Sequence, residues 1–217
     1  MLEDIKVLLV DDHAIVREGL RLVLEARPGF TIVGEAEDGH QALGLVAKLR
    51  PDVVVMDIAM PNLNGVEATR QIKRHFPDVK VVILTMHEDE RYLVRIVRAG
   101  AVGCVLKRSA ATELVTAVRA ATRGESYFSP TMATKILGGY RTHLAEARDE
   151  VDVLTERERE ILQLVAEGKT SQEIADLLFI SATTVHTHRI HILRKLGSHD
   201  RTDLVKRAIH LGLIPAE

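Results

Sequence analysis

Three carboxylates, one hydroxyl and one ammonium group stand at the ends of short apolar runs in the first half of the chain. Asp11 and Asp12 follow KVLLV, Asp57 ends VVVMD, Thr85 ends VVILT and Lys107 ends CVLK. A single polar residue at the end of a strand means only that the strand meets solvent there. Five such groups on four apolar runs indicate instead that the runs deliver them to a common site.

This set of groups suits phosphoryl transfer assisted by Mg²⁺. The ion prefers hard oxygen ligands, keeps several waters and shares phosphate oxygens. A carboxylate beside it can act as a nucleophile toward a phosphoryl group, which gives an aspartyl phosphate. The hydroxyl of Thr85 and the ammonium group of Lys107 are suited to hold the phosphoryl oxygens. We therefore predict a magnesium and phosphoryl site built from these residues.

The apolar runs also predict the sheet that positions these groups. They are rich in β-branched residues and nearly continuous, which is typical of strands buried on both faces. Amphipathic stretches at 14–26 and 65–76 predict helices between them. Five strand–helix units predict an α/β fold, a five-stranded doubly wound parallel sheet in which the strands share one carboxyl edge. The predicted strands are 5–10, 30–36, 52–57, 79–85 and 102–107.

The second half of the chain has a different pattern. Residues 125–150 are interpreted as a linker, in which SPTMATKILGGY predicts a short helix ended by Gly138 and Gly139. The remaining residues carry no strand signal, and Thr155 with Glu158 predicts a capping box at the start of their first helix. We predict an α/β domain over 1–124, the linker over 125–150 and an all-α four-helix domain over 151–217, with its later helices at 171–178, 182–196 and 201–212.

Composition narrows the class of protein. The chain has 217 residues, of which 46% are hydrophobic and 28% charged, as expected for soluble domains with apolar cores. Its one cysteine, Cys104, excludes an internal disulfide framework. The N-terminal apolar run has six residues and is ended by carboxylates, which fits neither a signal peptide nor a membrane span. We expect a cytoplasmic protein with no membrane partner.

Charge is unevenly distributed in the helical half. The net charge of −2 argues against a general nucleic-acid binder. Residues 151–181 carry three Lys or Arg against seven acidic residues, whereas residues 182–211 carry six against two, together with five histidines. This split favours a small domain with one acidic and one basic face.

The motifs of the first half resemble the receiver domain of two-component response regulators. The resemblance rests on LLVDDHAIVREGL, VVVMDIAMPNLNGVEA, VVILTMH and CVLK, and it runs through residues 5–123. It implies that Asp57 accepts a phosphoryl group from a sensor histidine kinase and that Thr85 and Lys107 respond to that group. It also implies a Mg²⁺ site formed by Asp11, Asp12, Asp57 and the carbonyl of Ala59.

Three residues depart from the receiver pattern. Cys104 stands where the family usually has Tyr or Phe, so the inward turn of an aromatic ring on activation cannot occur in its usual form. Arg108 replaces a proline that many receivers carry after the lysine. Met86 follows Thr85, where small residues are common, and is expected to shield the phosphoryl group in part.

Three histidines lie within six positions of the predicted helix 182–196. At about 100° per residue, His186 and His188 point about 160° apart, and His191 lies about 140° from His186. They cannot close around one metal ion, and a His188–His191 pair lacks a third ligand at a helical spacing. His188 shares its face with apolar residues, whereas His186 lies on the opposite, polar face.

A helix-turn-helix explains this segment better than a metal site does. In such a motif, the helix 171–178 crosses above the recognition helix 182–196. The outer face of the recognition helix offers hydroxyls, an imidazole and an isoleucine, which suit base edges and thymine methyls. A plain helical bundle with a solvated basic face is the alternative. The predicted DNA-contacting residues are Lys169, Thr170, Thr183, Thr184, His186, Thr187, Ile190, Arg194 and Lys195.

Residues 154–214 resemble the LuxR-type DNA-binding domain, and the whole chain resembles the NarL/FixJ response regulators. The resemblance rests on LTEREREILQLVAEGKTSQEIADLLFISATTVHTHRIHILRKLG. It implies binding to double-stranded promoter DNA, a structural role for His188, and a homodimer formed through the last helix on activation. Leu204, Val205 and Ala208 are the predicted dimer residues.

Two other functions fit parts of the sequence. A Mg²⁺-dependent phosphohydrolase would use a similar acidic site but usually has a second Asp two residues after its nucleophile, where this chain has Ala59. A regulator that is controlled by a partner protein and ignores phosphate is the second alternative, favoured by Cys104 and Met86. We expect a transcriptional regulator rather than an enzyme.

Overall fold

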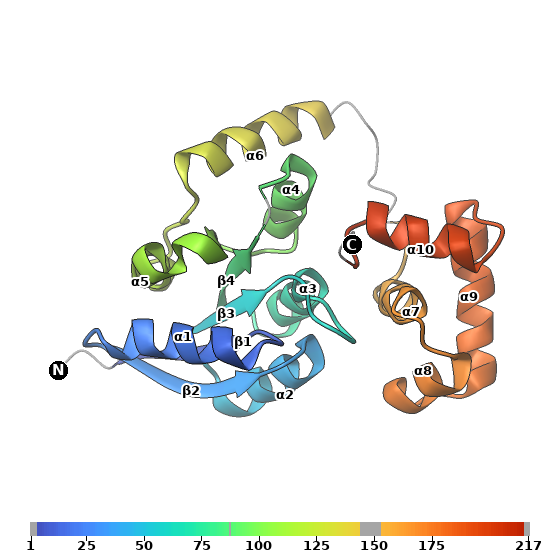
Figure 1. Ribbon diagram of the computed structural model, residues 1–217, viewed down its shortest axis with the longest axis horizontal. Helices are drawn as coiled ribbons and strands as arrows, with labels where there is room; N and C mark the ends of the chain where they lie inside the picture. Colours follow the sequence, from blue (N-terminus) through green and yellow to red (C-terminus); the bar gives the residue numbers. More distant parts are fainter. Residues whose placement is uncertain (1–3, 87, 144–152, 215–217) are drawn as a thin grey trace. The chain divides into compact units, whose positions relative to one another are not determined.

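The structure is a computed structural model that describes residues 4–86, 88–143 and 153–214 (Figure 1). The chain forms two compact units, Met1–Leu144 and Ala145–Glu217. The first unit holds the sheet and the helices α1 to α6, and the second holds α7 to α10. None of the helices in the described ranges has the length and apolar content needed to cross a bilayer.

Five parallel strands form the sheet in the order β2-β1-β3-β4-β5. Their bounds lie within one residue of the predicted runs. The chain order reverses beside β1, and in open α/β sheets ligands bind at the carboxyl edge near such a reversal. The doubly wound α/β fold is therefore confirmed. The strands are β1 (Ile5–Val10), β2 (Phe30–Ala36), β3 (Val53–Asp57), β4 (Lys80–Thr85) and β5 (Gly103–Leu106).

Helices cover both faces of the sheet. Val7 and Leu9 pack in one core cluster with α1 and α5, whereas Leu8 and Val10 pack in another with α2, α3 and α4. All four side chains are fully buried, which explains why the strand is a continuous apolar run. The helices are α1 (Ala14–Glu25), α2 (Gly39–Leu49), α3 (Gly65–His75), α4 (Glu90–Arg98) and α5 (Ala110–Thr122), and a 3₁₀ turn, η1 (Lys107–Ser109), precedes α5.

The segment after α5 returns to the free edge of β5. The Tyr127 N–H donates to the carbonyl of Val102 at 3.0 Å, and the Cys104 N–H donates to the carbonyl of Tyr127 at 2.9 Å. Phe128 packs against the same core cluster as the buried Cys104 side chain. The start of the predicted linker is thus part of the first unit.

Helix α6 (Pro130–His143) corresponds to the predicted short helix, but the end point predicted for it was wrong. The helix continues through Gly138 and Gly139 instead of ending at them. It packs on α4 (Figure 1), and a Cβ at Gly139 would lie 2.5 Å from Cγ2 of Val94. Glycine is therefore required here for close helix packing, which offsets its low helix propensity. The rest of the predicted linker, from residue 144, lies outside the described residues.

The second unit is a compact helical domain, as predicted. Its helices are α7 (Glu156–Ala166), α8 (Ser171–Leu178), α9 (Ala182–Leu196) and α10 (Arg201–His210). The capping box of Thr155 and Glu158 is confirmed, and a second one, not predicted, joins Thr170 and Glu173 at the start of α8. Ile161, Ile174, Val185, Ile192 and Leu204 are among the side chains of its apolar core.

Substituting alanine for Gly138 or for Gly139 tests the packing of α6. In a helix, alanine is favoured over glycine by about 1 kcal/mol. At Gly138 the new methyl would meet its nearest atom at 3.6 Å, but at Gly139 it would clash with Val94. We expect Gly138→Ala to be neutral or stabilising in urea unfolding and Gly139→Ala to lose about 1–3 kcal/mol, the usual range for overpacking. Equal stabilities for the two variants would contradict the α4–α6 contact.

Candidate functional site

The predicted acidic groups meet at the carboxyl edge of the sheet. Asp57 ends β3 and Lys107 follows β5, and their side chains lie 2.9 Å apart, between Nζ and Oδ2. The same Nζ lies 2.8 Å from Oδ2 of Asp11, at the end of β1. The Asp11 and Asp57 carboxylates are almost fully buried. One ammonium group therefore bridges two buried carboxylates from different strands.

Burial dominates the electrostatics of Asp57. It raises the pKa of this carboxyl from 3.8 to about 6, although the charge and hydrogen bond of Lys107 act in the opposite direction. The pKa of Lys107 is itself raised: burial lowers it, but the hydrogen bonds and charges of Asp11 and Asp57 outweigh that effect. The site thus holds two carboxylates against one cation, and a further cation would stabilise the ionised form of Asp57.

Asp12 completes a group of donors that suits a metal ion. Ligand atoms of Asp11, Asp12 and His13 all lie within 4.8 Å of one another. His13, which the sequence did not single out, places Nδ1 2.7 Å from Oδ1 of Asp12. Carboxylate oxygens favour a hard cation such as Mg²⁺. Together with Asp57 and the carbonyl of the exposed Ala59, they fit the predicted magnesium site by donor chemistry.

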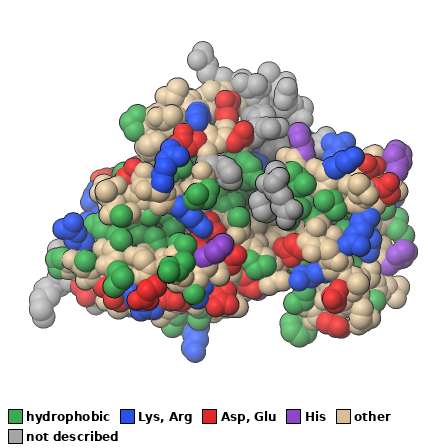
Figure 2. All heavy atoms as spheres, viewed as in Figure 1, with side chains coloured by type: hydrophobic (Ala, Val, Ile, Leu, Met, Phe, Trp, Pro, Cys, Tyr) green, Lys and Arg blue, Asp and Glu red, His purple; other side chains and the backbone are tan. Residues whose placement is uncertain are grey.

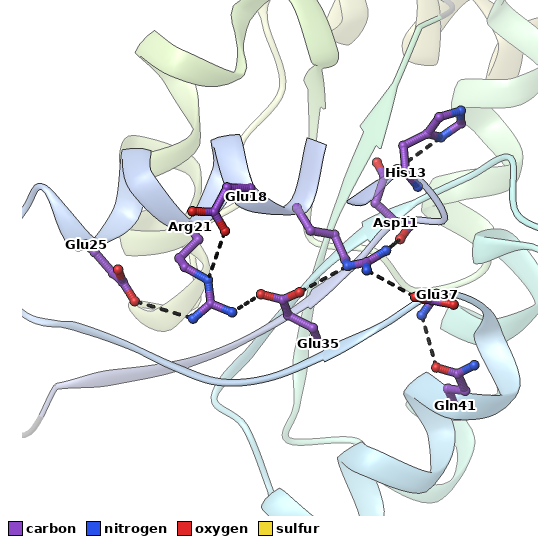
Figure 3. Close-up of polar contacts among 9 residues, drawn as sticks. Asp11, His13, Glu18, Arg21, Glu25, Glu35, Glu37 and Gln41 are labelled. Carbon is purple, nitrogen blue, oxygen red and sulfur yellow. Dashed lines mark hydrogen bonds and ion pairs between the residues drawn. The ribbon is translucent and has the colours of Figure 1, made fainter. Parts of the chain in front are cut away.

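A buried arginine on α1 holds the end of β1 in place. Nη1 of Arg17 donates to the backbone carbonyl of Asp11 at 2.7 Å, and its other nitrogens donate to Glu35 and Glu37, both at 3.1 Å. Figure 3 shows these acceptors at the end of β1 and β2, with Arg21 bridging Glu35 to carboxylates of α1. The network fixes the backbone that carries Asp11. Sequence reasoning missed it because its members come from three segments, the ends of β1 and β2 and helix α1, which no local sequence pattern links.

The turn after Asp57 depends on a glycine. A Cβ at Gly65 would lie 1.8 Å from the carbonyl oxygen of Asp57. The Gly65 N–H donates to the carbonyl of Ile58 at 2.9 Å, and Asn64 caps α3 by accepting from the N–H groups of Val66 and Glu67. Helix α3 can therefore begin directly against the strand end that presents the Asp57 carboxylate.

Thr85 and its neighbours complete this edge. Thr85 is buried and pairs in register with Leu106, the residue before Lys107. Met86 is 64% exposed, so it extends over the surface. Cys104 is buried, and burial raises the pKa of its thiol to about 12. A thiol of this kind is a poor nucleophile at neutral pH, which argues against a redox role.

The second unit presents the outer face of α9. Thr183, Thr184, His186 and Thr187 are exposed, and Ile190 is 48% exposed. In the view of Figure 2, Lys, Arg and His side chains gather over α9 and α10. Ser181 caps α9 by accepting from the Thr184 N–H. This face combines hydroxyls, an imidazole and an apolar group with positive charge, as predicted for a DNA-contacting helix.

Several predicted DNA-contacting residues also have structural roles. Nζ of Lys195 lies 2.7 Å from Glu158 on α7, and Thr170 caps α8. Arg194 is exposed and Lys169 is half-buried. Arg189, which was not predicted, donates to Ser171 Oγ at 3.0 Å and so ties α9 to the start of α8.

The inner side chains of α9 and α10 face the apolar core of the second unit. Nδ1 of His188 is buried, in agreement with the inner face predicted for this side chain. Leu204 and Ala208 are buried in the helical core, and Val205 is half-buried. Of the three predicted dimer residues, Val205 thus has the most surface for a partner, and the dimer contact stays a prediction.

Replacing Asp57 with asparagine tests the electrostatics of the acidic edge in metal-free protein. Because the folded pKa is about 6 and the ordinary value is 3.8, the unfolded chain loses this proton first as the pH rises. As the pH rises from 3.8 to about 6, the ionised Asp57 carboxyl therefore opposes folding increasingly, and above about pH 6 it opposes folding in full. Near pH 8 we expect Asp57→Asn to raise the free energy of unfolding by up to about 3 kcal/mol, with little gain near pH 4. A gain that did not depend on pH, measured by urea unfolding, would be inconsistent with this assignment.

Comparison with known proteins identifies both units. Residues 7–119 match the response regulator receiver domain, and residues 152–208 match the bacterial regulatory proteins of the luxR family. The transcriptional regulatory protein LiaR of Bacillus subtilis (strain 168) is 45% identical over 198 residues, covering 91% of this chain and 93% of LiaR. The transcriptional regulatory protein DegU of Brevibacillus brevis is 38% identical over 224 residues, covering 97% and 95%.

A solved structure of two RcsB dimers bound to two parallel DNAs has a TM-score of 0.57 and 29% sequence identity, and it covers 94% of this chain and 97% of that chain. The two matched families account for the sheet with its acidic edge and for the helix-turn-helix. The chain belongs to the response regulators that join a receiver domain to a LuxR-type DNA-binding domain, and it is a transcriptional regulator.

Proposed function

We propose that this regulator is switched by phosphorylation of Asp57. The observation that carries the proposal is the contact of Lys107 with both Asp57 and Asp11 at the carboxyl edge of the sheet. A sensor histidine kinase would supply the phosphoryl group. A carboxylate oxygen of Asp57 attacks the phosphorus of a phosphohistidine, the P–N bond breaks, and the electron pair returns to the imidazole.

The residues around Asp57 have separate roles in this reaction. Asp11, Asp12, Asp57 and the Ala59 carbonyl would hold Mg²⁺, which supplies charge neutralisation for the phosphoryl oxygens. Lys107 exchanges its ion pair with Asp57 for one with the new phosphoryl group. Thr85 donates its hydroxyl to the same group. Phosphorylation then shifts the population toward an active arrangement, by as much as the phosphoryl group is held more tightly there.

The output of the switch is sequence-specific binding to promoter DNA. The exposed face of α9 supplies Thr183, His186, Thr187 and Ile190 for base edges. Thr184, Arg194 and the N-termini of α8 and α9 supply contacts for phosphates. We keep three further residues as predicted phosphate contacts: Lys169, Thr170 and Lys195. Two of them would make these contacts in addition to a structural role, since Thr170 caps α8 and Lys195 pairs with Glu158. The DNA-bound RcsB dimers support both DNA and a second copy of the chain as partners.

Two alternatives are weaker. A phosphohydrolase would need a general acid two residues after the nucleophile, and Ala59 offers none. A regulator that responds only to a partner protein would leave the acidic edge with a structural role alone. The burial of Asp57 and its raised pKa favour a functional site over that alternative, because perturbed carboxyl groups cluster at functional sites.

Sedimentation with beryllofluoride and Mg²⁺ tests the switch. Beryllofluoride mimics the aspartyl phosphate, and we expect it to convert monomer to dimer and to strengthen DNA binding in the wild-type protein. Asp57→Ala should show neither response, because it lacks the carboxylate that binds the mimic. A full response in Asp57→Ala would sink the phosphorylation proposal, and an unchanged mass and DNA affinity in the wild type would favour control by a partner protein.

Two exposed histidines test the DNA-contacting face. His186 lies on the outer face of α9, whereas His199 lies in the turn before α10 and serves as the control. On DNA selected from a random pool by the wild-type protein, we expect His186→Ala to weaken binding roughly tenfold, as for one lost base contact. His199→Ala should bind like the wild type. If the two variants kept the same affinity and base preference, His186 would not contact bases.

A further inference from the structure

Glu88 lies between two cations in the connection from β4 to α4. Its Oε1 is 2.5 Å from Nη2 of Arg108, and its Oε2 is 3.1 Å from Nζ of Lys135. The side chain of Glu88 is 24% exposed, that of Lys135 is 37% exposed and that of Arg108 is 67% exposed. The carboxylate therefore joins three segments of the receiver that are distant in the sequence.

One end of this bridge lies at the carboxyl edge of the sheet that carries Asp57, the proposed phosphoacceptor. This part of the receiver is called the phosphoacceptor edge below. Arg108 is the residue after Lys107, which contacts Asp11 and Asp57. Glu88 also follows Thr85 by three residues along the chain. Lys107 and Arg108 belong to the same 3₁₀ turn, η1, so a movement of Lys107 toward a phosphoryl group would also move the backbone that carries Arg108.

The other end belongs to α6, the last described element before the chain continues to the helical unit. Lys135 lies on this helix, next to Ile136, which is buried in the receiver core together with Met132. One turn further, Gly139 lies against two residues of α4, Glu90 at its start and Val94 in its middle. The helix that leaves the receiver is thus packed beside the connection that carries Glu88.

Partly exposed ion pairs of this kind contribute little to stability, because water and salt screen them. Their geometry is nevertheless specific, since hydrogen bonds to a carboxylate weaken steeply as distance and angle change. A glutamate that shares its two oxygens between two cations links their positions, so a displacement of one cation changes the contact with the other.

We propose that Glu88 is a positioning residue that couples the phosphoacceptor edge to α6. The proposal rests on the phosphorylation of Asp57 proposed above. When Lys107 and Thr85 close on the phosphoryl group, the Arg108–Glu88–Lys135 bridge rearranges, and the hold of α6 on α4 changes with it. The route uses the linker helix itself and needs no aromatic side chain at the position of Cys104.

Hydrogen–deuterium exchange of the full chain, with and without beryllofluoride and Mg²⁺, tests the coupling. In the wild type we expect beryllofluoride to protect the segments around Asp57 and Thr85 and to change exchange in residues 130–143 several-fold. In Glu88→Gln the same protection should remain, while residues 130–143 no longer respond. Lys135→Gln should behave in the same way, because it breaks the other half of the bridge.

Glu125→Gln is the matched control. Glu125 forms an exposed pair with Arg123 at 2.7 Å, but it contacts neither end of the bridge in the described structure. Its response to beryllofluoride should equal that of the wild type. A wild-type α6 that does not respond, despite protection around Asp57, would overturn the coupling alone, as would a normal α6 response in Glu88→Gln. An absence of protection around Asp57 in the wild type would overturn the phosphorylation proposal instead.

Discussion

The receiver is organised around the ammonium group of Lys107, which lies between the buried carboxylates of Asp11 and Asp57. Two carboxylates in a desolvated edge repel each other and oppose folding unless cations accompany them. Lys107 compensates them only in part, as the raised pKa of Asp57 shows. A divalent cation at the proposed magnesium site would offset the same deficit in positive charge that weakens the domain. The stability of the domain and the proposed binding of the cation therefore depend on the same charge balance.

That balance requires accurate backbone positions, and the surrounding structure supplies them. The parallel sheet brings the ends of β1, β3 and β5 to one edge. Arg17 donates a hydrogen bond to the Asp11 carbonyl, and Gly65 lets α3 approach the backbone of Asp57. Neither residue needs to touch a ligand. The two act on the strand ends from opposite sides, so the edge is held by groups that belong to helices on both faces of the sheet.

The sequence predicted the strands, the acidic edge and the recognition helix because each depends on a local pattern. Buried strands are apolar runs, and α9 has an apolar stripe with His188 on it. Contacts between distant segments left no such pattern. The path of α6 through Gly139 is decided by Val94, the Arg17 network joins α1 to β2, and Glu88 meets Lys135 across 47 positions. In each case the partner, rather than the residue's own propensity, determines the structure.

The pairing of Tyr127 with β5 has a consequence for any isolated receiver. An unpaired strand edge offers N–H and carbonyl groups to other chains and promotes aggregation. Here the Cys104 N–H and the Val102 carbonyl are already occupied by Tyr127. A fragment cut at residue 124, where the sequence alone places the domain boundary, would uncover them. Self-association of that fragment would then reflect an uncovered strand edge rather than the dimerisation proposed for the intact protein.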